Sequence, residues 1–137
     1  MQYPLIASYP RGMRLLVVDD EVRMAAVLKR GLEEDGYRVD VVTNGLDALR
    51  RATEFAYDAV LLDVMLPGMS GLEVCRQLHA QGVRTSIIMV SACDSIADRI
   101  SGLEAGADEY LVKPVSFSDL TATLNAATRS RRECPTR

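Results

Sequence analysis

The sequence predicts an α/β domain built on a doubly wound, five-stranded parallel sheet, and three observations lead to this fold. Five short apolar runs are continuous rather than alternating, which is typical of strands that are buried on both faces. Five segments with apolar residues at helical spacing follow these runs, and such alternation favours parallel strands with helices on both sides. Polar residues end most of the runs, and open α/β sheets bind their ligands at that edge.

Each expected strand is a short run, and four of the five runs stop at a polar residue. The runs cover residues 14–18, 39–42, 59–62, 86–90 and 110–112. The polar residues that directly follow the first, third, fourth and fifth runs are Asp19, Asp63, Ser91 and Lys113. Because the carboxyl ends of parallel strands lie at the same edge of a sheet, these side chains are expected along one edge.

The helices are expected between the strands. The first covers residues 22–34, where Ala25, Leu28 and Leu32 share one face and Gly36 provides a stop. The next three helices have apolar faces with residues three or four positions apart. Those faces consist of Leu46, Leu49 and Ala52, then Leu72, Cys75 and Leu78, and then Ile96, Ile100 and Leu103, with Gly106 closing the last.

The fifth helix is expected to begin at Ser116. Its spacing to Asp119 is that of a capping box, and Leu120 and Leu124 follow on one face. The seven residues after Ser130 are expected to form a tail or the start of a linker.

Length and composition fit a single compact domain. The chain has 137 residues, of which 48% are of apolar types, with a formal net charge of -3. This mild charge gives no case for a nucleic-acid surface. No apolar run reaches the ~18 residues that span a bilayer, and the N-terminus has no signal-peptide pattern. A cytoplasmic location and no membrane partner are therefore expected. The three cysteines are an odd number without metal-ligand spacing, so reduced thiols are expected.

The predicted edge carries the chemistry. If the first and third strands are neighbours, Asp19, Asp20 and Asp63 converge there, and three close carboxylates repel one another. A divalent cation with oxygen ligands, Mg²⁺ or Mn²⁺, relieves this repulsion. Lys113 adds a positive charge and Ser91 a hydroxyl, which together suit a phosphoryl group. A carboxylate can itself be the nucleophile and become an acyl phosphate.

Three motifs give the chain a resemblance to the receiver domain of bacterial two-component response regulators. They are Leu-Val-Val-Asp-Asp-Glu at 16–21, Leu-Leu-Asp-Val-Met-Leu-Pro-Gly-Met-Ser-Gly at 61–71 and Gly-Ala-Asp-Glu-Tyr-Leu-Val-Lys-Pro at 106–114. The second and third are most similar to the OmpR/PhoB-type subfamily. The resemblance implies a flavodoxin-like strand order of 2-1-3-4-5. It also implies a receiver domain over residues 13–130, an N-terminal tail over 1–12 and a C-terminal tail or linker over 131–137.

The resemblance implies a role for each acidic residue. Asp63 is the expected phosphoacceptor, which takes its phosphoryl group from a sensor histidine kinase in a magnesium-dependent reaction. Asp20, Asp63 and the backbone carbonyl of Met65 are expected to hold the ion, with Asp19 acting through a water molecule. Lys113 is expected to bind the phosphoryl oxygens.

The resemblance also implies a conformational switch. Ser91 is expected to bind the phosphoryl oxygens and to move towards them while Tyr110 turns inward, a population shift driven by the new charge. The peptide bond between Lys113 and Pro114 is expected to be cis. At the position of Cys93, two residues after Ser91, many members of the family have an Arg.

The expected dimer uses the fourth helix, fifth strand and fifth helix, but one of its usual charge pairs is missing. Relatives pair an acid at the Glu109 position with an Arg on the fifth helix, where this chain has Thr123. Met65 and Cys93 flank the expected path of attacking water and should alter the lifetime of the phosphorylated state.

The implied output is transcription, through a DNA-binding domain that usually follows the receiver in this subfamily. The alternative is a stand-alone regulator that acts by protein contact. The chain is not expected to be an enzyme, because an aspartyl-phosphate phosphatase needs Asp-x-Asp after its first strand, whereas Asp19 and Asp20 are adjacent. A flavin carrier would need a Ser/Thr/Gly-rich loop after the first strand, and this chain has Asp19-Asp20-Glu21 there instead. A pseudo-receiver that only binds partners would not need the full set of polar residues.

Overall fold

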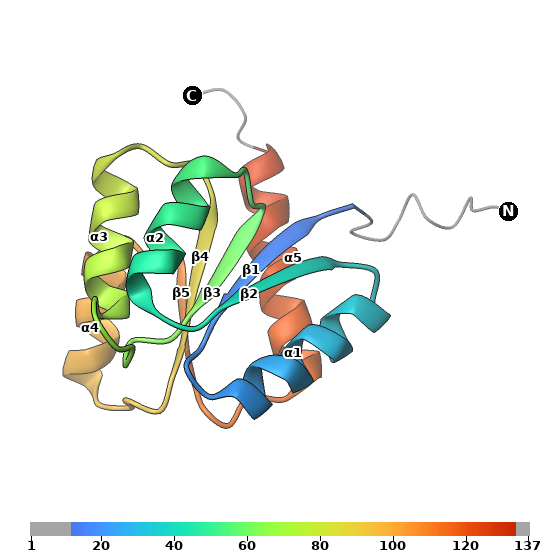
Figure 1. Ribbon diagram of the computed structural model, residues 1–137, viewed down its shortest axis with the longest axis horizontal. Coiled ribbons are helices and arrows are strands. Elements are labelled where there is room, and N and C mark those ends of the chain that lie inside the picture. Colours follow the sequence, from blue (N-terminus) through green and yellow to red (C-terminus); the bar gives the residue numbers. More distant parts are fainter. Residues whose placement is uncertain (1–11, 134–137) are drawn as a thin grey trace, which may run out of the picture.

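Strands and helices alternate strictly along the chain in the computed structural model, which describes residues 12–133 (Figure 1). The strands are β1 (Arg14–Val18), β2 (Arg38–Val42), β3 (Ala59–Leu62), β4 (Ser86–Ser91) and β5 (Glu109–Val112). The helices are α1 (Val22–Glu34), α2 (Gly45–Glu54), α3 (Gly71–Ala80), α4 (Ile96–Glu104) and α5 (Phe117–Glu133). The predicted order of five strands and five helices is confirmed.

The five strands form one parallel sheet in the order β2-β1-β3-β4-β5, as the resemblance implied. Helices α1 and α5 cover one face, and α2, α3 and α4 cover the other (Figure 1). From β1 the chain adds β2 on one side, and it then adds β3, β4 and β5 on the other. The loops after β1 and β3 therefore lead to helices on opposite faces of the sheet. Such a reversal of strand order leaves a crevice at the carboxyl ends of the strands.

Each central strand contributes to two separate cores. In β1, Leu16 and Val18 pack towards α2 and α3, while Leu15 and Val17 pack towards α1 and α5. All four side chains are buried, and burying a Leu or Val side chain contributes about 1.5–3 kcal/mol. This two-sided burial explains why the strands are continuous apolar runs.

The open edge of the sheet at β2 is partly covered by a lysine. Lys29 of α1 donates from Nζ to the backbone carbonyl of Val39 over 2.9 Å, and it also forms an ion pair with Glu33 at 3.2 Å. The carbonyl of Val39 points away from β1, because the neighbouring Arg38 uses its own N–H to bond the Met13 carbonyl in the sheet. The lysine therefore occupies an acceptor that a further strand would use.

The predicted apolar face of α2 was wrong in one residue. Leu46 is 52% exposed, whereas Ala48 and Ala52 are buried in the core and the predicted Leu49 packs against it. Small residues allow the helix backbone to approach the sheet closely. The spacing of the apolar residues therefore identified the helix and, except for Leu46, the side that is buried.

The same correction holds more strongly for α4. Its three predicted face residues, Ile96, Ile100 and Leu103, are 77%, 50% and 46% exposed. The buried residue of this helix is Gly102, which lies against Tyr110 of β5. The helix thus packs through its smallest residue and leaves an apolar stripe on the surface.

Two helix boundaries differ in detail from the sequence prediction. Ser116 accepts a hydrogen bond from the N–H of Asp119 at 3.1 Å, as a capping serine does, and α5 then continues to Glu133. Residues 131–133, which were expected in the tail, are therefore helical, because neither Gly nor Pro interrupts the chain before Pro135. The rest of that tail, 134–137, and residues 1–11 of the N-terminal tail lie outside the described part.

Over residues 12–133, none of the helices combines the length and apolarity needed to cross a bilayer.

The two cysteines of the described part differ in accessibility, and we expect them to differ in reactivity. Burial raises the pKa of the Cys75 thiol to about 11, with the Asp108 carboxylate adding to the effect, and its Sγ lies 3.4 Å from the Ala105 carbonyl oxygen. Cys93 is only half-buried. In a Cys134→Ser protein at about pH 8, iodoacetamide should modify Cys93 at least ~100-fold faster than Cys75, as measured by peptide mass spectrometry. Equal rates in the folded protein would contradict this packing, and urea-unfolded protein provides the reference in which both thiols react.

Candidate functional site

The acidic residues predicted from the sequence lie together beyond β1 and β3. Val18 and Leu62 are paired in the sheet, so the residues that follow them, Asp19 and Asp63, begin at the same edge. Backbone bonds hold both positions: the N–H of Asp63 donates to the Val18 carbonyl at 3.1 Å, and the N–H of Asp19 donates to the Val42 carbonyl at 3.2 Å. Hydrogen bonds of the sheet thus fix the backbone positions of Asp19 and Asp63.

Three carboxylates converge at this edge. One oxygen from each of Asp19, Asp20 and Asp63 lies within 4.8 Å of the others. Asp19 and Asp63 are buried, whereas Asp20 is exposed. The cluster is therefore a shallow acidic site with a buried floor and one open side.

Lys113 joins the two buried carboxylates. Its Nζ donates to Asp19 Oδ2 over 2.9 Å and to Asp63 Oδ2 over 3.0 Å. Burial by itself lowers the pKa of this ammonium, but the hydrogen bonds and charges of the two carboxylates outweigh burial, so the pKa is raised. The lysine therefore stays charged over the physiological range. Its peptide bond to Pro114 is cis.

The donor set of this site fits a small, hard divalent cation. Lys113 compensates one of the three carboxylate charges, which leaves two negative charges among the oxygens that cluster. Mg²⁺ is typically bound through one or two carboxylates while it keeps several waters, and the exposed side at Asp20 leaves space for them. The oxygens that remain free of Lys113 are partly engaged by the backbone, since Asp63 Oδ1 accepts the N–H of Met65 at 3.1 Å.

The loop between β3 and α3 is held tightly against the phosphoacceptor candidate. The N–H of Gly71 donates to the Val64 carbonyl at 2.9 Å. A Cβ atom on Gly71 would lie 2.0 Å from the Asp63 carbonyl oxygen, and one on Gly45 would lie 1.9 Å from the Met69 carbonyl oxygen. Sequence reasoning did not assign these glycines a role, although Gly71 ends one of the motifs. They keep the loop close to the sheet and to α2.

The two expected switch residues lie beside each other but are engaged with the loop after β4. Ser91 is fully buried, and its Oγ accepts the N–H of Cys93 at 3.2 Å. Tyr110 is 5% exposed and donates from its hydroxyl to the Cys93 carbonyl at 2.7 Å. Burial raises the pKa of the Tyr110 phenol. The tyrosine is thus in an inward position, with Cys93 linking it to Ser91.

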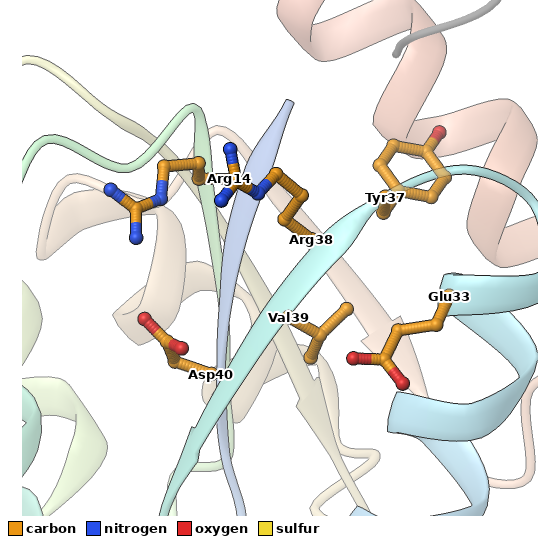
Figure 2. A pocket seen from close by; sticks show the side chains of 6 residues that line it. All are labelled: Arg14, Glu33, Tyr37, Arg38, Val39 and Asp40. Carbon is orange, nitrogen blue, oxygen red and sulfur yellow. The ribbon is translucent and has the colours of Figure 1, made fainter. Parts of the chain in front are cut away.

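A second hollow lies at the opposite end of β1 and β2. This space has a volume of about 440 Å³. Its lining side chains are those of Arg14, Glu33, Tyr37, Arg38, Val39 and Asp40 (Figure 2). Its Asp40 carboxylate accepts hydrogen bonds from the Tyr57 hydroxyl at 2.5 Å and from Arg51 at 3.0 Å, and these contacts lower the pKa of Asp40. That acid is therefore part of a structural network, separate from the acidic cluster.

Comparison with known proteins gives a consistent result. The family model described as "Response regulator receiver domain" matches residues 15–125. The transcriptional regulatory protein TcrA of Mycobacterium tuberculosis is 48% identical over 118 residues, which is 86% of this chain and 47% of that protein. The response regulator MprA of Mycobacterium avium is 44% identical over 117 residues, covering 85% of this chain and 51% of that protein. The chain spans about half the length of these relatives.

A solved structure resembles the fold closely. The receiver domain of the sensor histidine kinase PA1611 from Pseudomonas aeruginosa, with a magnesium ion coordinated in its active-site cleft, has a TM-score of 0.80 and 34% sequence identity. The match covers 86% of this chain and 98% of that one.

Proposed function

Because the chain belongs to the response regulator receiver domain family, and within it resembles the OmpR/PhoB-like members, we propose that it takes a phosphoryl group on Asp63. The observation that carries this proposal is the position of Lys113 Nζ, which bonds both Asp19 and Asp63 at the edge where three carboxylates meet. A lysine in this position can follow the Asp63 oxygen as it changes from a carboxylate to an acyl phosphate.

The proposed reaction is a single phosphoryl transfer. A lone pair of an Asp63 carboxylate oxygen forms the new bond to phosphorus, while the bond from phosphorus to a histidine nitrogen of the kinase breaks. The imidazole nitrogen keeps that electron pair and is protonated. Lys113 balances the negative charge on the transferring oxygens, and its bonds to Asp19 and Asp63 hold the nucleophile in place.

A divalent cation, Mg²⁺ or Mn²⁺, is the proposed cofactor of this site. Asp20, Asp63 and the backbone carbonyl of Met65 would hold it, with Asp19 linked through a water molecule. When bound, the cation supplies positive charge that neutralises the phosphoryl oxygens. The PA1611 receiver domain contains magnesium in its corresponding cleft, which supports the assignment.

Ser91 and Tyr110 are the proposed readout. A phosphoryl group on Asp63 offers new acceptor oxygens to the Ser91 hydroxyl, which now accepts the Cys93 N–H. Phosphorylation can shift the equilibrium only to the extent that these groups bind one conformation better than the other. The Met65 side chain is exposed beside Asp63, and with Cys93 it is proposed to set how fast water removes the phosphoryl group.

The proposed output is control of transcription through a DNA-binding domain of the full-length protein. The names of TcrA and of its relatives as transcriptional regulators support this, because the chain matches about half of their length. A homodimer through α4, β5 and α5 is supported by the exposed stripe Ile96, Ile100 and Leu103, although Thr123 does not provide the usual charge. The alternative output is protein contact by the receiver alone. The proposed location is the cytoplasm, where a sensor kinase domain would be met.

The direct test uses a small acyl phosphate as the donor. Incubation with acetyl phosphate and Mg²⁺ should add one phosphoryl group to the intact protein, and EDTA should prevent the addition. Intact-mass spectrometry measures the product, and its lability to hydroxylamine identifies an acyl phosphate. A protein that gains no phosphoryl group under these conditions, or gains it equally with EDTA, would contradict the proposal.

A further inference from the structure

The ring of Tyr110 occupies a gap that exists only because residue 102 of α4 is a glycine. A Cβ atom built on Gly102 would lie 2.6 Å from Tyr110 Cδ2 and 2.9 Å from Tyr110 Cε2. Carbon atoms in contact lie about 3.5–4.0 Å apart, so a side chain at this position and the present ring position exclude each other. Met89 of β4 also borders the gap, with its Cγ 3.6 Å from the Cβ position built on Gly102.

The gap has a cost in helix stability, because glycine is disfavoured inside helices. Gly102 lies in the second half of α4, is buried, and has ordinary helical backbone without a positive φ. An alanine at an unconstrained helix position would be more favourable, since it loses less backbone entropy on folding. The helix therefore gives up intrinsic stability at a residue where a side chain would collide with the tyrosine ring.

The polar end of the ring connects this gap to the candidate site. The Tyr110 hydroxyl donates to the Cys93 carbonyl at 2.7 Å, and the Cys93 N–H donates to Ser91 Oγ at 3.2 Å. One residue of the loop after β4 thus contacts both the buried ring and the hydroxyl proposed to bind the phosphoryl group. A change in the ring position must break or move the first of these bonds.

We propose that Gly102 is a positioning residue for Tyr110, and that the space it leaves sets the balance between the inward and outward positions of the ring. The packing statement is independent of phosphorylation. Its consequence for signalling rests on the proposed function of Asp63 and Ser91. A Cβ at position 102 should shift the ring outward and uncouple it from Cys93, while the acidic cluster of Asp19, Asp20 and Asp63 keeps its arrangement.

The first measurement is a reversal of sign in thermal stability. Gly102→Ala should lower the Tm by ~5 °C in the wild-type background, because the clash outweighs the gain in helix propensity. In a Tyr110→Ala background the same change should raise the Tm by ~2 °C, because only the gain in propensity remains. Tyr110→Leu provides a second ring-free background if Tyr110→Ala folds poorly. Ser101→Ala, on the same helix, is the matched control and should give similar shifts in both backgrounds.

The second measurement follows the ring itself. In protein labelled with ¹³C on tyrosine, the Tyr110 signal, assigned by its loss in Tyr110→Phe, should be protected from a soluble paramagnetic agent. Gly102→Ala should make that signal accessible, and acetyl phosphate with Mg²⁺ should still label Asp63. Equal Tm shifts for Gly102→Ala with and without the ring, or an unchanged Tyr110 signal, would overturn the inference. Absence of labelling in the wild type would instead contradict the proposed function and leave the result of the packing test standing.

Discussion

Asp63→Asn is expected to abolish labelling by acetyl phosphate, with uptake reduced on the order of 100-fold or more. The amide nitrogen lone pair is delocalised, and the remaining carbonyl oxygen is a far weaker nucleophile than a carboxylate. The substitution keeps the shape of the side chain, so Lys113 retains its bond to Asp19 and the loop keeps its course. Intact-mass spectrometry after incubation with Mg²⁺ measures the loss.

A control variant and a stability measurement make this test specific. Asp58→Asn changes an exposed carboxylate that accepts the N–H of Arg14 at the far end of the sheet, and it should label like the wild type. Asp63→Asn should also be no less stable than the wild type without Mg²⁺, because one of three clustered negative charges is removed. Labelling of Asp63→Asn at the wild-type rate would show that another carboxylate of the cluster is the nucleophile.

Gly71→Ala is expected to cost about 3 kcal/mol of unfolding free energy, which corresponds to a fall in Tm of ~10 °C. The added Cβ would lie 2.0 Å from the Asp63 carbonyl oxygen and 2.9 Å from the Val64 Cα. Both contacts are with backbone, which cannot rotate away as a side chain can. The loop must move, so labelling of Asp63 should also slow by ~10- to 100-fold, because small displacements of a reacting group are costly.

Gly36→Ala separates this clash from the general cost of replacing a glycine. Gly36 has a φ of +99°, and nothing lies within 4 Å of a Cβ built there. Its replacement should therefore cost only about 1 kcal/mol from backbone strain, and labelling should be unchanged. Thermal melts and labelling time courses of the two variants provide the comparison. Equal labelling rates would mean that Gly71 does not hold Asp63 in place.

The strands were predictable because burial on both faces leaves a simple pattern. The continuous runs that include Leu16 and Leu61 had no other ready explanation, and the polar residues at their ends followed directly. The strand order could not be predicted in this way, because the sequence of a strand does not show which strands lie next to it. It came from the resemblance, and the structure confirms it.

The orientation of the helices was harder to predict for a physical reason. In α4 the apolar residues Ile96, Ile100 and Leu103 lie on the surface, and the helix packs through Gly102. A hydrophobic stripe can face the core or a partner, and the sequence pattern is the same in both cases. The sequence pattern does not show which individual side chains touch. The contact of the Tyr110 ring with Gly102 is visible only in the three-dimensional structure.

The bond from Lys29 to the Val39 carbonyl has a consequence for how copies of this chain can meet. A sheet grows sideways when a second backbone finds free donors and acceptors along an edge strand, and this is a common start of aggregation. At β2 one acceptor is already engaged by an ammonium group that is also held by its ion pair with Glu33. Addition of a strand there would require the bond to break and the lysine to lose solvation. In crowded solutions, association of this protein by extending the sheet past β2 should therefore be disfavoured.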